Sequence, residues 1–578
     1  MFKRFLPLLL AMALLTGCSS QAVIQLPAQE AGMTVAYIPL DDRPVNDDRV
    51  VYLAESLGLE FLMPDQSLYH TALDYQEVNS DGSQYGDRGA LWTWLMETEE
   101  DGCDVYLLSL DQLFSGGLVN SRSVYAGTDI PFPDGSVLTE EQVIDQYLLP
   151  LLSNPDNQVY LIDTVMRLAP TVGYEGFGLE EYTLLRDYAM EPRPTLEGAD
   201  LTVENIIADY SLDANGNVII PDQAISADMI ENYFAARARK LTLADTLLSA
   251  TQPMDNVHWL IGIDDSAPSS SIQTNELNYL RQQIAGRGAV LSGADEDGML
   301  ALCRLYSDLC YTGALPTVLV RYYGGSESTA ASDFDHQSMT DVVDEHLAYL
   351  GITQVSDGSH DMELLVLTAP GDGASATWED LITQINTNEN SAMPTMVSDG
   401  AKYAYGDAFA NALIGKTDLG SLFGYGGYYD LANVTGVTIS NGIARWLHLA
   451  ENDTVSMTEN QAFAKTLADS LIKDLCYKND SKVDLTLYVR EELGGDPDNF
   501  ARLDTDIALT QTFLESAMAE DTASVLKNLS KSNLMVDLEG NQMGWGTITL
   551  SEFESPWLRV FEPRYTITVE EFGTTHWW

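Results

Sequence analysis

The sequence predicts an α/β protein, and two observations support this class. Short apolar, β-branched runs recur along the chain, and each is followed by a loop and an amphipathic stretch. Continuous apolar runs that alternate with helical segments are typical of a parallel sheet covered on both faces. The clearest runs span residues 35–38, 105–108, 159–162, 259–263, 289–291, 317–320, 364–367 and 395–397.

The order of these runs is compatible with a (β/α) barrel or with two doubly wound lobes. Of the two, we expect a barrel-like domain over residues 34–314, followed by a Rossmann-like lobe over residues 315–454. Helical patterning across residues 180–250 interrupts the alternation and predicts a helical insertion. Residues 455–578 contain helices and aromatic β-like segments, which predict an α+β C-terminal domain.

The first 17 residues predict a secretory signal peptide. A basic start is followed by an apolar run over residues 5–15, which is too short to cross the ~30 Å of a bilayer core as a helix. Residues 15–18, Leu-Thr-Gly-Cys, resemble the lipobox of bacterial lipoproteins. The resemblance implies that Cys18 is diacylated and becomes the mature N-terminus. We therefore expect a protein that is lipid-anchored on the extracytoplasmic face of the cell membrane, with residues 18–33 as a flexible tether.

The composition limits the partners. The chain has 29 basic and 87 acidic residues, a formal net charge of −58. Such a surface repels polyanions, so nucleic acid is excluded as an expected partner. It also disfavours anionic lipid headgroups, so the lipid on Cys18 is expected to provide the membrane contact. The remaining cysteines form no CxxC motif and predict buried thiols: Cys103, Cys303, Cys310 and Cys476.

Polar residues follow the apolar runs at the point where each predicted strand ends. In a parallel α/β sheet, ligands bind beyond the carboxyl ends of the strands. A single aspartate in such a loop is usually a helix cap or a turn residue. Their recurrence after five runs predicts instead an acidic cleft that contains a few arginines. The candidate ligand-binding residues are Asp41, Asp42, Arg43, Asp111, Arg122, Arg167, Asp295, Glu296, Asp399 and Asn433.

Six motifs resemble, in order, those of the bacterial domain-of-unknown-function family 4127, a family without an established activity. They are PLDDRPVN (39–46), LD with GGL and SR (110–122), MRLAP (166–170), DDSAP (264–268), GADE (293–296) and PWLRVFE (556–562). The resemblance spans about Val35 to Glu562. One departure stands out, because the family's Gly-Trp-Asn-Thr motif corresponds here to Gly-Tyr-Tyr-Asp at 427–430, although Asn433 and Gly436 still match. If that loop contacts substrate, the departure implies a different specificity.

Asp264 and Asp265 are the candidate catalytic pair. Adjacent residues of a strand point to opposite faces, so both can serve one site only where the strand ends and the chain turns. Residues 266–268, Ser-Ala-Pro, provide that turn. An apolar strand that ends in Asp-Asp is similar, over about eight residues, to the catalytic pair of β-N-acetylglucosaminidases of glycoside hydrolase family 84. The resemblance implies substrate-assisted hydrolysis, in which Asp264 orients the acetamido group and Asp265 protonates the leaving oxygen.

Two other readings of these residues stay open. The first is structural: a helix cap with a loop ion pair to Arg43 or Arg167. The second is a metal site, since the strand-end carboxylates suit Ca²⁺ or Mg²⁺, although no cofactor is otherwise expected. The seven histidines show no spacing typical of a zinc site.

The leading functional prediction is hydrolysis of extracellular or cell-wall carbohydrate. The alternative is a non-catalytic surface protein that binds a glycan or another small molecule. Catalysis would require Asp264 or Asp265 to share one pocket with Asp41, Asp111 or Glu296. A binding protein would require no such convergence and is expected to have two lobes around a hinge.

Overall fold

The computed structural model describes residues 33–124, 127–372, 375–503, 505–532, 534–538, 542–544 and 547–570. The predicted signal peptide, Cys18 and the tether up to residue 32 lie outside the described residues. Within these ranges, no helix combines the length and the apolar character needed to cross a membrane.

The first sheet has six parallel strands in the order β2-β1-β3-β6-β7-β8. The strands are β1 (Thr34–Ile38), β2 (Glu60–Leu62), β3 (Val105–Ser109), β6 (Gln158–Val165), β7 (Val257–Ile263) and β8 (Gly288–Ser292). The sheet is open, with β2 and β8 at its edges, so the expected barrel-like N-terminal region does not form. A barrel adds each new strand on the same side. Here β2 is added on one side of β1 and all later strands on the other side.

The second sheet repeats this winding with five parallel strands in the order β10-β9-β11-β12-β13. The strands are β9 (Thr317–Tyr323), β10 (Thr353–Val355), β11 (Met362–Leu367), β12 (Thr395–Asp399) and β13 (Gly424–Gly427). Again the second strand lies on one side of the first, and the later strands lie on the other. The α/β class is confirmed, and its architecture is that of two doubly wound sheets.

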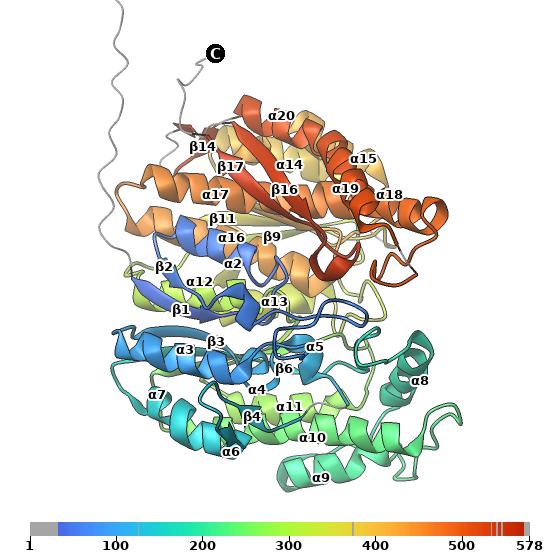
Figure 1. The fold of residues 1–578 in the computed structure, drawn as a ribbon. Coiled ribbons are helices and arrows are strands. Elements are labelled where there is room, and N and C mark those ends of the chain that lie inside the picture. Colours follow the sequence, from blue (N-terminus) through green and yellow to red (C-terminus); the bar gives the residue numbers. More distant parts are fainter. Residues whose placement is uncertain are drawn as a thin grey trace, which may run out of the picture.

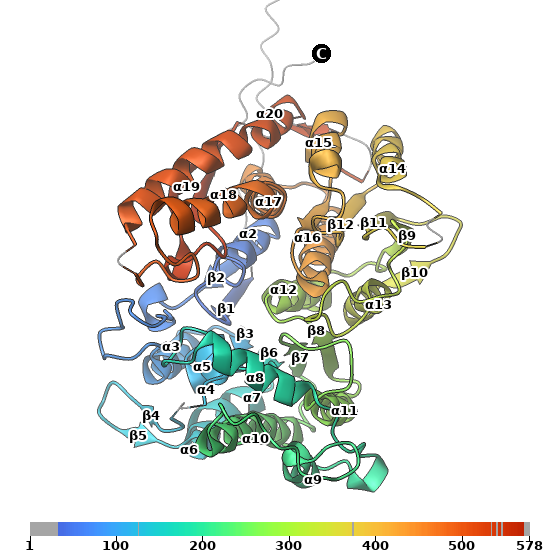
Figure 2. The same cartoon turned by 90° about the vertical axis from the view of Figure 1, so that its right-hand side faces the viewer.

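One layer of helices lies between the two sheets (Figures 1 and 2). The layer consists of α2 (Asp48–Ser56), α12 (Asp297–Leu309), α13 (Met339–Tyr349) and α16 (Leu431–Glu451). Side chains of both sheets are buried against it, and they alternate along each strand as a pleated backbone requires. In β1, for example, Val35 and Tyr37 face this shared core, while Ala36 and Ile38 face the opposite core. One continuous apolar core therefore joins the two sheets.

The outer face of the first sheet is covered mainly by four helices. They are α3 (Arg88–Glu100), α4 (Leu110–Ser115), α10 (Ala227–Ala250) and α11 (Gln273–Ile284). Helix α10 connects β6 to β7 and packs in this layer, so the end of the region predicted as an insertion belongs to the α/β layer. The smaller elements here are β4 (Ile130–Pro131), β5 (Val137–Leu138), α5 (Leu118–Ser121), α6 (Glu140–Val143), α7 (Leu149–Ser153), α8 (Leu179–Met190) and α9 (Val203–Ala208).

The outer face of the second sheet is covered by helices of the lobe and of the C-terminal region. They are α14 (Trp378–Ser391), α15 (Asp407–Lys416), α17 (Met457–Ser470), α18 (Lys482–Leu487), α19 (Ile507–Asp521) and α20 (Ala523–Ser532). Two antiparallel strand pairs complete the C-terminal region: β14 (Leu534–Val536) with β15 (Gln542–Gly544), and β16 (Ile548–Glu554) with β17 (Arg564–Val569).

A buried ion-pair network ties the first sheet to the C-terminal region. Arg49 of α2 lies 2.8 Å from Asp469 of α17 and 3.1 Å from Asp474, and all three side chains are buried. Lys473 and Lys478 complete the network, at 3.3 Å from Asp469 and 2.9 Å from Asp474. Each carboxylate therefore has two basic partners, and Arg49 donates a buried hydrogen bond to both of them.

We predict that Arg49→Met destabilises the protein by about 3–5 kcal/mol, because two buried carboxylates each lose a charge-assisted hydrogen bond while keeping a lysine partner. Lys465 provides a matched control, since it joins the same two helices through a more exposed pair with Glu55. Lys465→Met is expected to cost less than about 1 kcal/mol. Denaturant unfolding of both variants measures the difference, and equal losses would contradict the role given to Arg49.

Candidate functional site

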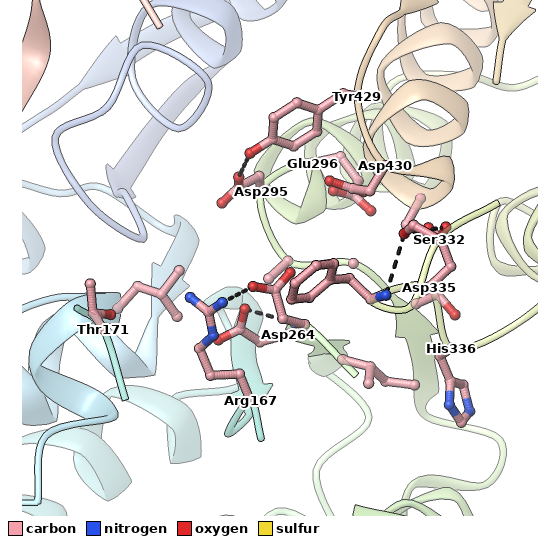
Figure 3. A pocket seen from close by; sticks show the side chains of 18 of the residues that line it. Arg167, Thr171, Asp264, Asp295, Glu296, Ser332, Asp335, His336, Tyr429 and Asp430 are labelled. Atoms are coloured by element: carbon pink, nitrogen blue, oxygen red, sulfur yellow. Dashed lines mark hydrogen bonds and ion pairs between the residues drawn. The ribbon is translucent and has the colours of Figure 1, made fainter. Parts of the chain in front are cut away.

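A cavity of about 560 Å³ lies at the carboxyl edge of the first sheet and reaches loops of the second (Figure 3). In doubly wound sheets, ligands bind at this edge, close to the point where the strand order reverses. That point lies here between β1 and β3, and both strands lead into the lining. The sequence-predicted residues that line the cavity are Arg43, Arg122, Arg167, Asp264, Asp265, Asp295 and Glu296.

Asp264 and Asp265 line the cavity at the end of β7, and each is paired with an arginine. Arg122 Nε lies 2.6 Å from Asp264 Oδ2, and Arg167 forms an ion pair with Asp265. Burial raises the pKa of Asp264, while Arg122 acts in the opposite direction. The side chain of Asp265 is 37% exposed, against 8% for Asp264, so Asp265 is the one that a ligand can reach. The ion pair expected from the structural reading exists with Arg167, but it lies within the cavity.

Arg43 connects three parts of the chain at the cavity wall. Its guanidinium donates to Asp41 at 2.8 Å and to Asp295 Oδ2 at 3.1 Å. It also lies over the ring of Trp557, with 5.0 Å between the guanidinium carbon and the ring centroid. Burial opposes the charge of Asp295, but Arg43 outweighs burial and lowers the pKa of this carboxyl group. Arg43 therefore keeps a charged carboxylate at the end of β8.

Glu296 and Asp430 form a second pair of carboxyl groups, without an arginine (Figure 3). Burial, followed by the charge of Asp295, raises the pKa of Glu296 to about 8. Asp430 is half-buried, and it accepts a hydrogen bond from the backbone N–H of Asn433 at 3.0 Å. Burial, followed by the charge of Glu296, raises the pKa of Asp430 well above its usual range. The two groups are thus driven towards their protonated forms.

Two glycines allow the chain to close over Glu296. A side chain at Gly436 of α16 would clash with the side chain of Glu296, and so would one at Gly293. Gly293 also has a φ of 97°, which glycine adopts readily and other residues do not. The close approach leaves both oxygens of Glu296 buried without a hydrogen-bond partner among the described residues.

Five sequence-predicted residues do not line the cavity. Asp41 lies behind Arg43, and Asp42 accepts a hydrogen bond from Trp557 Nε1 at 2.8 Å. Asp111 pairs with Lys240 and accepts a hydrogen bond from the Thr164 hydroxyl at 2.7 Å. Asp399 accepts one from the Ala401 N–H at 3.1 Å, and burial raises its pKa to about 7. Asn433 contributes its backbone N–H to Asp430.

The expectation that ligand-binding residues follow the predicted strands (the strand-end rule) did not identify several of the lining residues. These are Tyr182, Asp335, His336, Lys402, Tyr429, Asp430, Trp557, Arg559 and Phe561, among others. Residues 557–561 come from the C-terminal region, and contacts of Trp557 with Asp42 and Arg43 bring them to the cavity. The PWLRVFE motif marked this segment without indicating a role, whereas the Gly-Tyr-Tyr-Asp departure linked residues 427–430 to specificity, and two of these residues, Tyr429 and Asp430, line the cavity.

The structure does not provide a set of ligands for the metal site that the sequence left open. Within the part of the chain that the structure describes, no group of three or more His, Cys, Asp or Glu side chains is arranged to hold a metal ion. Four of the strand-end carboxylates that suit Ca²⁺ or Mg²⁺ in type are instead paired with a basic side chain: Asp41, Asp111, Asp264 and Asp265.

The buried carboxyl group of Glu296 predicts a pH-dependent stability. Its pKa is about 8 in the folded protein, against an ordinary value of 4.5. Between these pH values, the folded protein therefore keeps a proton that the unfolded chain has released. The free energy of unfolding therefore falls as the pH rises from about 4.5 to about 8. Glutamine does not titrate, so its contribution does not change with pH. We therefore expect the free energy of unfolding of Glu296→Gln, relative to that of wild type, to rise by about 2–4 kcal/mol across this interval.

Calorimetric melting at about pH 5 and about pH 8.5 tests this prediction. Glu141→Gln, on an exposed position of α6, is the control and should keep a constant difference from wild type. If Glu296→Gln and wild type also differed in stability by the same amount at both pH values, Glu296 would already be ionised in the folded protein.

Comparison with known proteins agrees with the resemblance of the motifs. The model of the family described as protein of unknown function (DUF4127) matches residues 35–566. No curated protein matches the chain. No solved structure matches it either. The match covers nearly the whole chain, including every strand end that lines the cavity, and the chain therefore belongs to the DUF4127 family.

Proposed function

We propose that this protein hydrolyses glycosidic bonds of extracellular or cell-wall carbohydrate. One observation carries the proposal: carboxyl groups with opposite tendencies to ionise line the same cavity. Asp430 and Glu296 are driven towards the protonated form, whereas Asp265 and Asp295 are paired with arginines. Cleavage of a glycosidic bond requires such a pair, with one group to donate a proton and one to act as base or nucleophile.

Asp430 is assigned as the proton donor and Asp265 as the base or nucleophile. Asp430 is half-buried at the cavity, so a leaving oxygen can approach it, whereas Glu296 lies deeper and raises the pKa of Asp430. Asp265 is more exposed than Asp264, and Arg167 holds its carboxylate in an ion pair at the cavity. This assignment keeps Asp265 in the reaction but moves proton donation, which the family 84 resemblance had given to it, to Asp430.

Asp264 is assigned as a positioning residue. It is buried against Arg122, and its Oδ1 accepts a hydrogen bond from the backbone N–H of Asp265 at 2.9 Å. This contact fixes the turn after β7, which in turn fixes the direction of the Asp265 side chain.

The rest of the lining suits a sugar. Five aromatic side chains make the lining partly apolar, while its charged groups offer hydrogen bonds to the hydroxyls of a sugar. These side chains are Tyr182, Phe334, Tyr429, Trp557 and Phe561. The lipobox at residues 15–18 supports a lipid-anchored, extracytoplasmic position, where such substrates occur.

A non-catalytic binding protein is the less favoured reading. The two sheets share one continuous apolar core, whereas a two-lobed binding protein would open about a hinge. Simple binding also gives no reason for keeping the carboxyl groups of Glu296 and Asp430 without an arginine or lysine partner among the described residues, with His346 Nε2 3.7 Å from Glu296 Oε1.

We predict that a screen of aryl glycosides and cell-wall glycans identifies a substrate whose turnover depends on Asp265 and Asp430. Asp430→Asn should lower the rate by about 10²–10⁴-fold for poor leaving groups, and far less for dinitrophenyl glycosides, which need no proton. Asp265→Asn should lower it for both. Asparagine also caps helices well, so Asp430→Asn is expected to fold.

Asp357→Asn, at an exposed position after β10, is the control and should keep full activity. Turnover by Asp430→Asn equal to wild type on poor leaving groups would remove Asp430 from its assigned role. Absence of any turnover across the screen would favour the binding reading.

A further inference from the structure

Arg559 differs from the other arginines of the cavity. Arg43, Arg122 and Arg167 each have an aspartate of the lining as partner. Arg559 forms no ion pair and no hydrogen bond with any residue that the structure describes. In a chain with 87 acidic and 29 basic residues, a cavity-lining arginine without a carboxylate is unexpected.

Two aromatic rings hold Arg559 in place. Its guanidinium carbon lies 4.6 Å from the ring centroid of Trp557 and 4.6 Å from that of Phe561. Such contacts attract a cation and orient the plane of the guanidinium, but they satisfy none of its five N–H donors. The donors are therefore oriented by the rings and left for a ligand.

The surroundings of Arg559 add positive charge. Burial, followed by Arg43, lowers the pKa of Arg559 to about 10, although Tyr429, Glu562 and Asp41 act in the opposite direction. On the ring of Phe561 lies a second cation, Lys482, with 5.1 Å between Nζ and the ring centroid. Burial, followed by Lys478 and Arg559, lowers the pKa of Lys482 to about 8. Burial of a cation is costly unless an anion pairs with it, and neither Arg559 nor Lys482 has an ion pair with a described residue.

We propose that Arg559 binds an anionic group of the ligand, so that the preferred substrate is an acidic carbohydrate. A guanidinium matches the oxygens of a carboxylate, a sulfate or a phosphate with two parallel hydrogen bonds, and such charge-assisted pairs are the strong ones. The carbohydrate part rests on the proposed function, whereas the anion site rests only on Arg559 and its surroundings.

Binding of matched sugars to the full-length mature protein tests the proposal without any need for turnover. The probes are glucuronate, glucose 6-sulfate and glucose 6-phosphate, each compared with glucose by calorimetry. We expect at least one acidic sugar to bind about tenfold or more tightly than glucose, and added NaCl to weaken only that binding. The probe that shows the preference identifies the kind of anion.

Variants assign the preference to Arg559. Arg559→Gln should bind the acidic sugar and glucose within about twofold of each other, while Arg559→Lys should keep part of the preference because it keeps the charge. Arg287→Gln, which precedes β8 at the opposite edge of the sheet, is the control and should behave as wild type. Equal binding of glucose and all three acidic sugars by wild type, or a full preference in Arg559→Gln, would overturn the proposal.

The outcome is independent of the hydrolysis screen. Turnover of neutral glycans with no preference for acidic sugars would refute the anion site and keep the hydrolase. A preference for acidic sugars that depends on Arg559, without turnover of any glycan, would keep the anion site and refute the hydrolase.

Discussion

Each doubly wound sheet ends with a helix that crosses into the layer between the sheets, and the rest of the site depends on how these two helices meet. Helix α12 follows β8, and α16 follows β13. Their N-cap residues are Glu296 and Asp430. Because the helices pack against each other in the shared core, their first turns bring the two carboxyl groups together. An acidic N-cap normally gains from the helix dipole in its charged form. Here burial outweighs that gain and raises the pKa of both groups.

The few basic residues then distinguish the carboxyl groups of the cavity by pairing with some of them. Arginines reach the ends of β7 and β8 and pair with Asp264, Asp265 and Asp295, although burial still raises the pKa of Asp264. Among the described residues, no arginine pairs with a carboxyl group at the junction of α12 and α16, where Asp297 also has both oxygens buried without a hydrogen-bond partner. A chain with a formal net charge of −58 cannot compensate every buried carboxylate, so the placement of its arginines creates two kinds of carboxyl group in one cavity. The carboxyl groups of the cavity therefore differ in their tendency to ionise because some have an arginine partner and others have none.

The sequence predicted most of the strands, because buried parallel strands are continuous apolar runs, and all eight runs lie within strands. It missed the short edge strands β2 and β10, and it missed β13, in which Gly424 and Gly426 carry no apolar signal. Both are glycines because α16 approaches the strand too closely for a side chain. It also favoured a barrel over an open sheet, because closure depends on which side of β1 the strand β2 is added, and periodicity does not record this. The strand-end rule located the cavity at the first sheet. It missed Asp430, which follows β13, because that strand carries no apolar signal, and it missed Arg559, which reaches the cavity from the C-terminal region.

The C-terminal segment is a wall of the site, and this explains why the family match extends so far. Trp557 donates a hydrogen bond to Asp42 and lies under Arg43, and Arg564 pairs with Asp47 and Asp48. Trp557 adopts a φ of 54°, a conformation that costs a non-glycine residue about 1 kcal/mol, which its two contacts offset. The first strand loop and the C-terminal segment therefore hold each other in position across the whole length of the chain. A site built in this way cannot be carried by either sheet alone, which accounts for a match that begins at residue 35 in β1 and ends at residue 566, just beyond Arg564.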